Sequence, residues 1–217
     1  MRAFLVTYRP LAVSKHGRSA ASSFPLPLFV DASCRREPDL QSVYPSISAL
    51  CRVNQFAPRL AEGDEVLYLT VKSAFGEAVA PYYRAVAHLR VKKRFESHAA
   101  AADWYKSQGC SVPNNCMVPG NSPKPFNQTG AAPGRKATAC STATGLRAWD
   151  RSYRQRSQRV GVFLACDPLW VELHQPPKLL VSDIAAVFGR VPGTRTPPQI
   201  AIAEVHALLQ RAKQNGA

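Results

Sequence analysis

The sequence predicts an α+β fold: a mixed, partly closed β-sheet with flanking helices and a long loop rich in asparagine and proline. Runs with the two-residue period of strands do not alternate regularly with helical runs, which argues against a doubly wound parallel sheet. Neither a dinucleotide-binding nor an NTP-binding glycine motif occurs. With 217 residues and 46% hydrophobic residues, the chain suits one domain, 1–217, with a proper core.

The N-terminal part combines short β-branched and aromatic runs with stretches rich in serine, alanine and proline. The first run, Phe-Leu-Val-Thr-Tyr, is typical of a strand, whereas the next stretch lacks any periodicity. Farther along, Ser46 is a candidate helix cap, and Ile47, Leu50 and Cys51 share one face of the helix that it would begin. From these patterns we expect strands at 4–8 and 28–31, a basic loop at 14–27 and a helix at 45–54.

The middle of the chain carries the clearest strand signals. Residues 65–72 follow a Gly-Asp turn, and residues 82–95 alternate apolar and basic side chains, which predicts a long strand with one cationic face in water. A helix is expected at 97–107, because a serine stands at its start and Gly109 at its end.

Residues 109–145 have little periodicity and hold five prolines and four asparagines. A loop of this length inside a compact domain is usually functional or disordered. We therefore treat 109–145, like 14–27, as a long loop or insertion. Beyond it the patterns predict strands at 160–166 and 169–173 and helices at 182–188 and 197–213.

The charge of the chain is its most informative property. Lys and Arg number 28 against 14 Asp and Glu, a formal net charge of +14. No carboxylate occurs at 104–149, and seven basic residues face the single Asp150 at 135–159. Like charges repel one another in a folded protein, so a polyanionic partner is the simplest explanation of the excess. Nucleic acid, and double-stranded DNA in particular, is the expected partner.

Other classes are disfavoured by what the sequence lacks. No apolar run approaches the ~20 residues that cross a bilayer, and the first residues do not resemble a signal peptide, so we expect a cytoplasmic protein without membrane contact. The six cysteines form no Cys-x-x-Cys pair and show no metal-ligand spacing with the five histidines. We expect free thiols, no metal and no cofactor.

The segment from Asp31 to Asp39 is the first candidate site. It holds the carboxylates of Asp31, Glu37 and Asp39 beside Arg35 and Arg36, in a chain where acid is scarce. A carboxylate near a sugar carbon can stabilise an oxocarbenium-like transition state or activate a water, as in glycoside hydrolysis. The two arginines would grip phosphates. The alternative is a solvated loop of surface ion pairs, each of which contributes ~0–1 kcal/mol.

Polar residues on neighbouring segments extend this site. The amides of Asn54 and Gln55 can position a water or bind a base edge, although an Asn at a helix end is often only a cap. On the strand at 65–72, Tyr68, Thr70 and Lys72 share one face. That face either lines a pocket, with Tyr68 stacking on a base and Lys72 near a phosphate, or lies in solvent.

The remaining candidates are contacts to the nucleic-acid backbone and to polar ligand edges. Basic side chains on the long strand and in the arginine-rich stretch suit phosphate contacts without sequence information. In the long loop, side-chain amides suit the recognition of a sugar or a base edge, or simply form surface turns. These candidates are Lys92, Lys93, Arg94, Arg151, Arg154 and Arg156 for phosphates, and Asn115 for a ligand edge.

Residues 31–39, 45–51 and 63–70 resemble members of the nucleotide-modification-associated domain families, and the Gly-Asp-strand element is also similar to PUA-like domains of the ASCH and EVE kind. The resemblance covers about residues 28–130. It implies a PUA-like barrel and a pocket for an unusual base in DNA. The long loop and the arginine-rich stretch after it depart from the PUA-like pattern.

These observations lead to three hypotheses. The first is a DNA glycosylase of anti-phage defence, which flips a modified base and hydrolyses its N-glycosidic bond. In it Asp31, Glu37 or Asp39 supplies the carboxylate and Asn54 positions water. The second is a reader of modified bases that breaks no bond, and the third is an RNA-binding module of PUA type.

Overall fold

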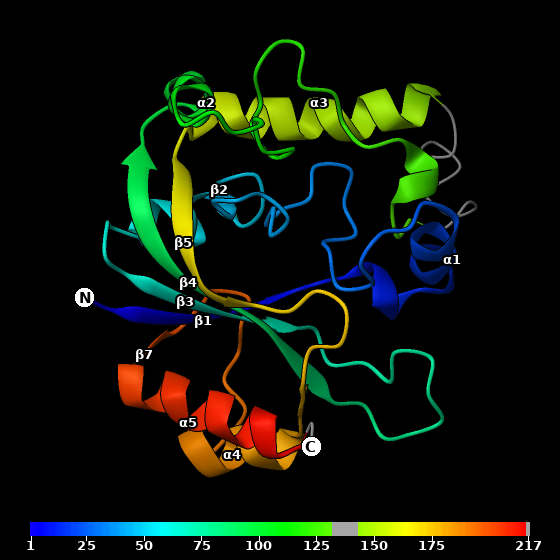
Figure 1. Ribbon diagram of the computed structural model, residues 1–217, viewed down its shortest axis with the longest axis vertical. Coiled ribbons are helices and arrows are strands. Elements are labelled where there is room, and N and C mark those ends of the chain that lie inside the picture. Colours follow the sequence, from blue (N-terminus) through cyan, green and yellow to red (C-terminus); the bar gives the residue numbers. More distant parts are fainter. Residues whose placement is uncertain (132–142, 216–217) are drawn as a thin grey trace.

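The structure, a computed structural model, describes residues 1–131 and 143–215. Its centre is a mixed seven-stranded sheet with the order β2-β5-β4-β3-β1-β7, while β6 pairs with one end of β4 (Figure 1). β1 runs parallel to β3, and the β3–β4 and β4–β5 pairs are antiparallel. The strands are β1 (Ala3–Tyr8), β2 (Ser46–Ser48), β3 (Glu65–Thr70), β4 (Tyr83–Phe95), β5 (Phe163–Val171), β6 (Lys178–Leu179) and β7 (Gln199–Ile200).

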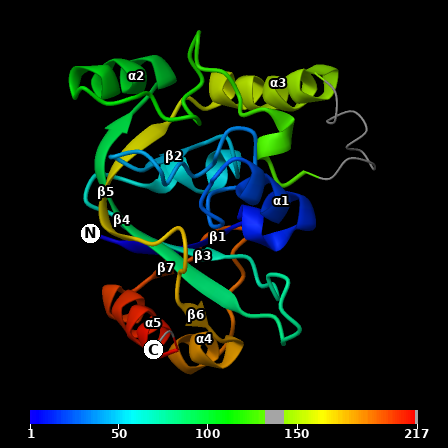
Figure 2. The ribbon, with the colours of Figure 1, turned by 45° about the vertical axis from the view of Figure 1, so that its right-hand side comes forward.

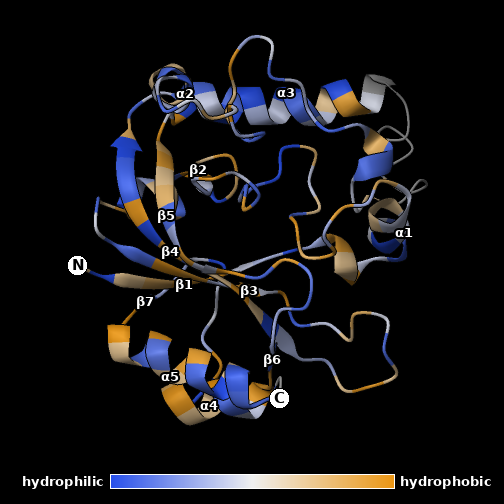
Figure 3. Ribbon diagram, in the orientation of Figure 1, coloured by the Kyte–Doolittle hydropathy of each residue, from blue (hydrophilic) through white to orange (hydrophobic). Residues whose placement is uncertain are grey.

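Helices lie on both sides of this sheet. α4 and α5 pack together below it in the view of Figure 1, while α2 and α3 lie above and α1 lies beside the end of β1 (Figures 1 and 2). In Figure 3 α3 is largely hydrophilic, whereas α5 alternates hydrophilic and apolar residues. The helices are α1 (Lys15–Ser23), α2 (His98–Ser107), α3 (Ala143–Arg159), α4 (Val181–Phe188) and α5 (Ile202–Gln214).

β3 is buried on both faces because it lies between β1 and β4 in the middle of the sheet. Val66 and Tyr68 belong to the core cluster on one face, and Leu67 and Leu69 to the cluster covered by α4 and α5. The alternative that the Tyr68 face lies in solvent is therefore wrong for Tyr68 and Thr70, which are at most 2% exposed.

The α+β class and the mixed sheet are confirmed. The sheet is open: β2 and β7 are its two ends, and no pairing between them occurs in the described ranges. The closure expected from PUA-like barrels is thus not observed. None of the described helices combines the length and the apolarity that crossing a membrane requires.

Caps at helix ends follow the sequence signals. The Ser97 side chain accepts a hydrogen bond from the Ala100 backbone N–H and begins α2, as expected, and Gly109 follows the helix with φ 67°. Ser14 caps α1 in the same way through the N–H of Gly17. Gly17 is required for a second reason, because a Cβ there would lie 2.1 Å from the carbonyl oxygen of Leu11.

The expected helix at 45–54 is wrong. Residues Ser46–Ser48 instead form β2, which pairs with β5, and Ser46 exchanges both backbone hydrogen bonds with Asp39. The buried Ile47 enters the core on the sheet face rather than on a helix face. Strand pairing here overrides a weak helical pattern that depended on three apolar positions, Ile47, Leu50 and Cys51.

Two expectations near the N-terminus are also wrong. The segment 14–27 contains α1, whose small Ala20 and Ala21 pack inward, so it is not a loop throughout. The segment 28–31 forms no strand, although Phe29 and Val30 are buried and Asp31 makes one antiparallel bridge to Pro10. The apolar content of this run indicated a strand, but in the structure it accounts for burial and not for strand pairing.

From residue 160 onward the structure follows the prediction with shifted boundaries, whereas the 17-residue helix α3 before it was not predicted. The two strands expected at 160–173 are one strand, β5, whose register shifts against β4. The expected helix at 197–213 begins only at Ile202, because β7 precedes it. The long loop at 109–145 is largely irregular as far as 131, and residues 132–142 of it lie outside the described residues, as do Arg135 and Lys136 of the basic stretch.

Candidate functional site

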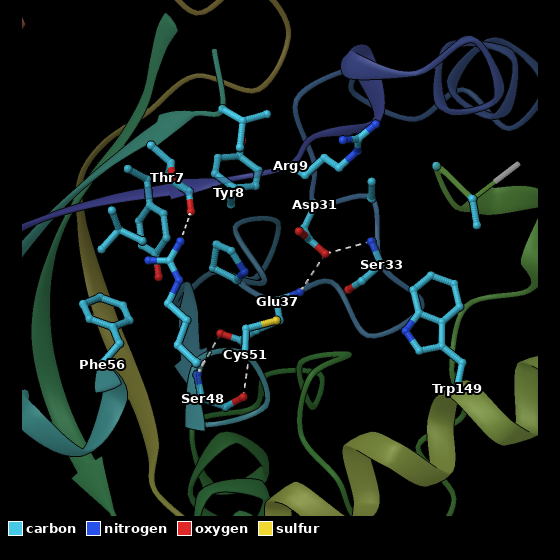
Figure 4. A pocket seen from close by; sticks show the side chains of 18 residues that line it. Thr7, Tyr8, Arg9, Asp31, Ser33, Glu37, Ser48, Cys51, Phe56 and Trp149 are labelled. Atoms are coloured by element: carbon cyan, nitrogen blue, oxygen red, sulfur yellow. Dashed lines mark hydrogen bonds between the residues drawn. The ribbon is translucent and has the colours of Figure 1, made fainter. Parts of the chain in front are cut away.

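A cavity of about 460 Å³ opens on the sheet face that α3 and the irregular segments cover. Its walls come from the C-terminal ends of β1 and β3, the segment 31–38, β2, residues 51–56 and Trp149 of α3. Figure 4 shows these side chains around one space. The size lies in the ~300–1,000 Å³ range of small-molecule and cofactor sites.

Aromatic rings form much of the cavity wall. Tyr8, Phe56, Tyr68 and Trp149 all line it. Tyr68 makes edge-to-face contacts with Tyr8 and Phe56, with ring centroids 5.9 and 6.4 Å apart. Because the Tyr8 hydroxyl donates a hydrogen bond to the Phe29 carbonyl oxygen, this ring is fixed in place. Such a wall suits a planar, aromatic ligand.

Asp31 is the first carboxyl group in the cavity. Its Oδ1 accepts hydrogen bonds from the backbone N–H groups of Ser33, at 2.8 Å, and Glu37, at 3.1 Å. The other carboxyl oxygen points away from these donors in Figure 4. Burial raises the pKa of Asp31 to about 6, although hydrogen bonds from Ser33 and the charge of Arg36 oppose the shift. At neutral pH the group is therefore a buried carboxylate.

Glu37 is the second carboxyl group, and protein donors surround it. Its Oε1 accepts from the Ser48 backbone N–H at 3.0 Å, and its Oε2 lies against the Ser48 hydroxyl and 2.9 Å from the Asn115 Nδ2. Burial raises the pKa of Glu37 to about 8, and the hydrogen bonds from Ser48 and Asn115 only partly offset this. At pH 7 the group holds a proton.

The two carboxyl groups therefore differ in protonation at neutral pH. A pair of acids whose surroundings separate their pKa values is the arrangement from which general acid and base roles arise. Asp31 can accept a proton from a bound water or stabilise a nearby positive charge. Glu37 positions the segment 31–39. Its backbone N–H donates to Asp31, and its side chain accepts hydrogen bonds from Ser48 of β2 and from Asn115.

The other two candidate catalytic residues lie outside this cavity. Asp39 is buried and accepts backbone hydrogen bonds from Asn114, at 2.8 Å, and Gln41, at 3.1 Å. It lines a separate polar depression. Asn54 lies in a short 3₁₀ helix, Val53–Gln55, and its side chain is exposed next to Gln55 on a third depression.

Arg35 and Arg36 are not available to grip phosphates. They are 0% and 2% exposed, which contradicts the role expected for them. Arg35 donates from Nε to Asp150 Oδ1 at 2.5 Å and from Nη1 to the Asn121 carbonyl at 2.8 Å. Arg36 donates to backbone carbonyls, including Gln128 at 2.6 Å. Both side chains hold the segment 31–39 against the long loop and α3.

The candidates on β3 and in the long loop are divided. Tyr68 lines the cavity, whereas the Thr70 hydroxyl accepts from the Arg84 N–H at 2.9 Å and Lys72 is exposed beyond the strand end. Asn115 is fully buried. Besides binding Glu37, its Oδ1 accepts from the Ser46 hydroxyl at 2.7 Å, so it supports the cavity wall rather than reaching a ligand.

The expected phosphate contacts lie on β4 and α3. Lys92 pairs with Asp167 at 3.0 Å and Lys93 extends over Phe95 and Trp104, while Arg94 is half-buried beside Glu96. On α3, Arg151 and Arg154 are exposed. Arg154 pairs with Asp150 at 3.0 Å, and Arg156 donates to the Leu50 carbonyl at 2.8 Å.

Sequence reasoning missed several residues of the cavity. Tyr8 ends β1 beside the parallel strand β3, and the carboxyl ends of parallel strands are frequent ligand sites. That signal needed knowledge of the pairing. Trp149 and Arg52 gave only weak signals in the sequence. Trp149 is an aromatic residue in an arginine-rich stretch, and Arg52 is a cation that follows Cys51. No group of three or more His, Cys, Asp or Glu side chains in the described ranges is placed to hold a metal ion.

Comparison with known proteins adds no relative to this picture. No protein-family model, no curated protein and no solved structure matches the chain. The resemblance to nucleotide-modification-associated and PUA-like domains therefore stays a prediction from residues 28–130.

Proposed function

We propose that the protein binds DNA, takes a flipped, modified base into the cavity and hydrolyses its N-glycosidic bond. The observation that carries this proposal is the position of Asp31: a carboxylate inside an apolar, aromatic-walled cavity of about 460 Å³. The aromatic walls suit stacking on a base, which contributes ~1–3 kcal/mol per base. The net charge of +14 supports a polyanionic partner.

The reaction assigns one step to Asp31. The C1′–N bond breaks and a C1′–O bond forms with a water molecule. The Asp31 carboxylate takes a proton from that water while it stabilises the positive charge that develops on the sugar. The proton then passes to the departing base, so that Asp31 returns to its ionised form. Glu37 keeps Asp31 in position through its backbone N–H.

The test uses duplexes that carry hypermodified bases, with unmodified duplexes beside them, followed by alkali to break the strand at abasic sites. We expect strand breaks on a modified substrate and a loss of ~10²–10⁴-fold in Asp31→Asn. The matched control is Asp167→Asn, an exposed carboxylate on β5. The proposal is wrong if no substrate gives abasic sites, or if Asp31→Asn cleaves as fast as the unaltered protein.

The second candidate is a reader that binds a modified base without breaking a bond. One observation favours it: Ser48 and Asn115 engage both oxygens of Glu37, so the cavity holds one available carboxyl group rather than two. A reader predicts tighter binding of a modified duplex than of an unmodified one, with no base released. Free base in the supernatant, measured by mass spectrometry, separates the two candidates.

A further inference from the structure

The third depression, of about 560 Å³, adjoins the cavity and shares one residue with it. The shared residue is Arg52, which lines both. The rest of the depression comes from segments far apart in the sequence: the 3₁₀ helix Val53–Gln55, the C-terminal end of α3 and the segment between α4 and β7. Its lining residues are Arg52, Val53, Asn54, Gln55, Arg159 and Arg195.

The charges in this depression are all positive. Three arginines line it together with two side-chain amides, and no carboxylate is among its lining residues. The ion pairs found within residues 1–131 and 143–215 include none of Arg52, Arg159 and Arg195. Three arginines around one depression, with no carboxylate among its lining residues, repel one another weakly and favour an anion from outside.

Arg52 is held in place by an unusual local geometry. Its backbone is left-handed, with φ 61°, and the following Val53 also has a positive φ of 39°. Non-glycine residues with such backbones carry ~1–3 kcal/mol of strain and gather at binding sites. The Arg52 Nη2 donates to the Thr7 carbonyl at 2.7 Å, whereas Nη1 is buried and has no partner among the described residues.

The segment that carries Arg195, on the other side of the depression, is bound to β1, the strand that Arg52 also contacts. The Thr7 hydroxyl lies 2.7 Å from that of Thr194, so the residue before Arg195 is fixed to the end of β1, which also lines the cavity. The Gln55 Oε1 is 3.5 Å from the Thr196 hydroxyl on the other side of Arg195. The depression is therefore built by contacts across its walls.

We propose that this depression binds a phosphate group of the DNA strand, next to the nucleotide whose base enters the cavity. Guanidinium groups match the planar edges of phosphate, and the amides of Asn54 and Gln55 add neutral donors. The identity of the strand rests on the proposed function, but the anion site does not. Asn54 and Gln55 thereby have a binding role, in place of the catalytic role expected for Asn54.

The test measures the affinity for a short fluorescein-labelled DNA duplex by fluorescence anisotropy over a series of KCl concentrations. The plot of log K against log salt has a negative slope, and each lost phosphate contact reduces the magnitude of that slope by about 0.9. We expect that loss, with weaker binding at every salt concentration, in Arg159→Gln and in Arg195→Gln. The matched control is Lys213→Gln, an exposed cation on α5 beyond the opposite face of the sheet, for which we expect an unchanged slope.

The outcomes separate this inference from the proposed function. Equal slopes for the arginine variants, Lys213→Gln and the unaltered protein overturn the phosphate site, even if Asp31→Asn abolishes base release. Reduced slopes for the arginine variants alone support the site, even if no duplex ever loses a base. Thermal unfolding of each variant shows whether a weakened affinity reflects loss of folded protein.

Discussion

The two faces of one sheet are covered in different ways. Below the sheet in Figure 1, α4 and α5 pack on a cluster without any charged side chain, with Leu5, Leu67, Leu69 and Leu208 at its centre. Above it, the buried charged groups Asp31, Arg35, Arg36 and Glu37 lie in irregular segments. The first face is mainly apolar, although Glu65 is buried at its edge and pairs with His88 and Arg90. The second face keeps a cavity, and hydrogen bonds join the irregular segments that form it.

Positive φ angles follow the same division. Arg36, Arg52, Val53 and Phe75 have them on the cavity side, whereas in the α4–α5 layer only Gly189, which tolerates this conformation at a helix end, does so. Among the described residues, non-glycine residues with positive φ thus lie on the side of the sheet that carries the cavity. Both faces therefore contribute to stability, the lower one mainly through apolar packing and the upper one through buried ion pairs and hydrogen bonds around the candidate site.

The largest expected effect comes from the buried ion pair of the upper face. Asp150→Asn leaves the Arg35 guanidinium without its counter-charge at zero exposure, and we expect a loss of about 3–5 kcal/mol in the free energy of unfolding. The exposed pair Lys92–Asp167 is the control, where Asp167→Asn costs less than about 1 kcal/mol. Urea unfolding measures both, and equal losses would contradict the contrast between them.

On the lower face, Leu208→Ala creates a void in an apolar cluster. We expect a loss of about 2–5 kcal/mol in the free energy of unfolding, with DNA affinity unchanged in the folded fraction. Leu169→Ala, at an exposed position on β5, should change stability by no more than about 0.5 kcal/mol. A weakened DNA affinity in folded Leu208→Ala would show that the two faces are not independent.

Trp149 tests the cavity wall without touching either carboxyl group. If a base stacks on its ring, Trp149→Leu weakens binding of a modified duplex by about 1–3 kcal/mol. Trp104→Leu serves as control. Trp104 belongs to α2 and packs against Tyr44, outside the cavity. Calorimetric titration measures both affinities, and similar losses in the two variants would remove the ring from the binding site.

The smallest expected effect is the pH dependence that Glu37 confers. Its pKa is raised from 4.5 to about 8, so the folded protein keeps a proton that the unfolded chain releases. This contribution is fully present below about pH 4.5 and is lost as the pH rises through about 8. Glu37→Gln should remove at least about 1 kcal/mol of that dependence between pH 5 and pH 8, measured by urea unfolding.

Glu96→Gln, at a carboxylate whose side chain is 77% exposed, should leave the pH dependence unaltered. Parallel curves for Glu37→Gln and the unaltered protein would mean that Glu37 is ionised in the folded state.

Regular, locally coded elements could be predicted from the sequence. The strand at 65–72, the long strand at 82–95 and the helix capped by Ser97 were found with boundaries shifted by at most two residues. Each depends on alternation or on a cap within a few residues. The β2 segment failed because its partner, β5, lies more than a hundred residues away, and a three-residue strand carries no local signal.

Residues of the candidate cavity were predicted only where a local sequence signal marked them. Acid scarcity pointed to Asp31 and Glu37, and a shared strand face pointed to Tyr68. Burial reversed the roles of Arg35 and Arg36, because nothing in the sequence says that an arginine in a basic chain will be enclosed by α3 and the long loop. Convergence of Arg52, Arg159 and Arg195 depends on the tertiary fold alone.

The contacts that close the cavity join distant parts of the chain, such as Glu37 with Asn115 and Arg35 with Asp150, which are 78 and 115 positions apart. Such segments can detach by local opening while the β3–β4 pair stays intact. In hydrogen–deuterium exchange, the amides of 31–39 should therefore exchange earlier than those of β3. Under the proposed function, entry of a bulky base would need only this partial opening, with the sheet as the fixed support on which the segments close again.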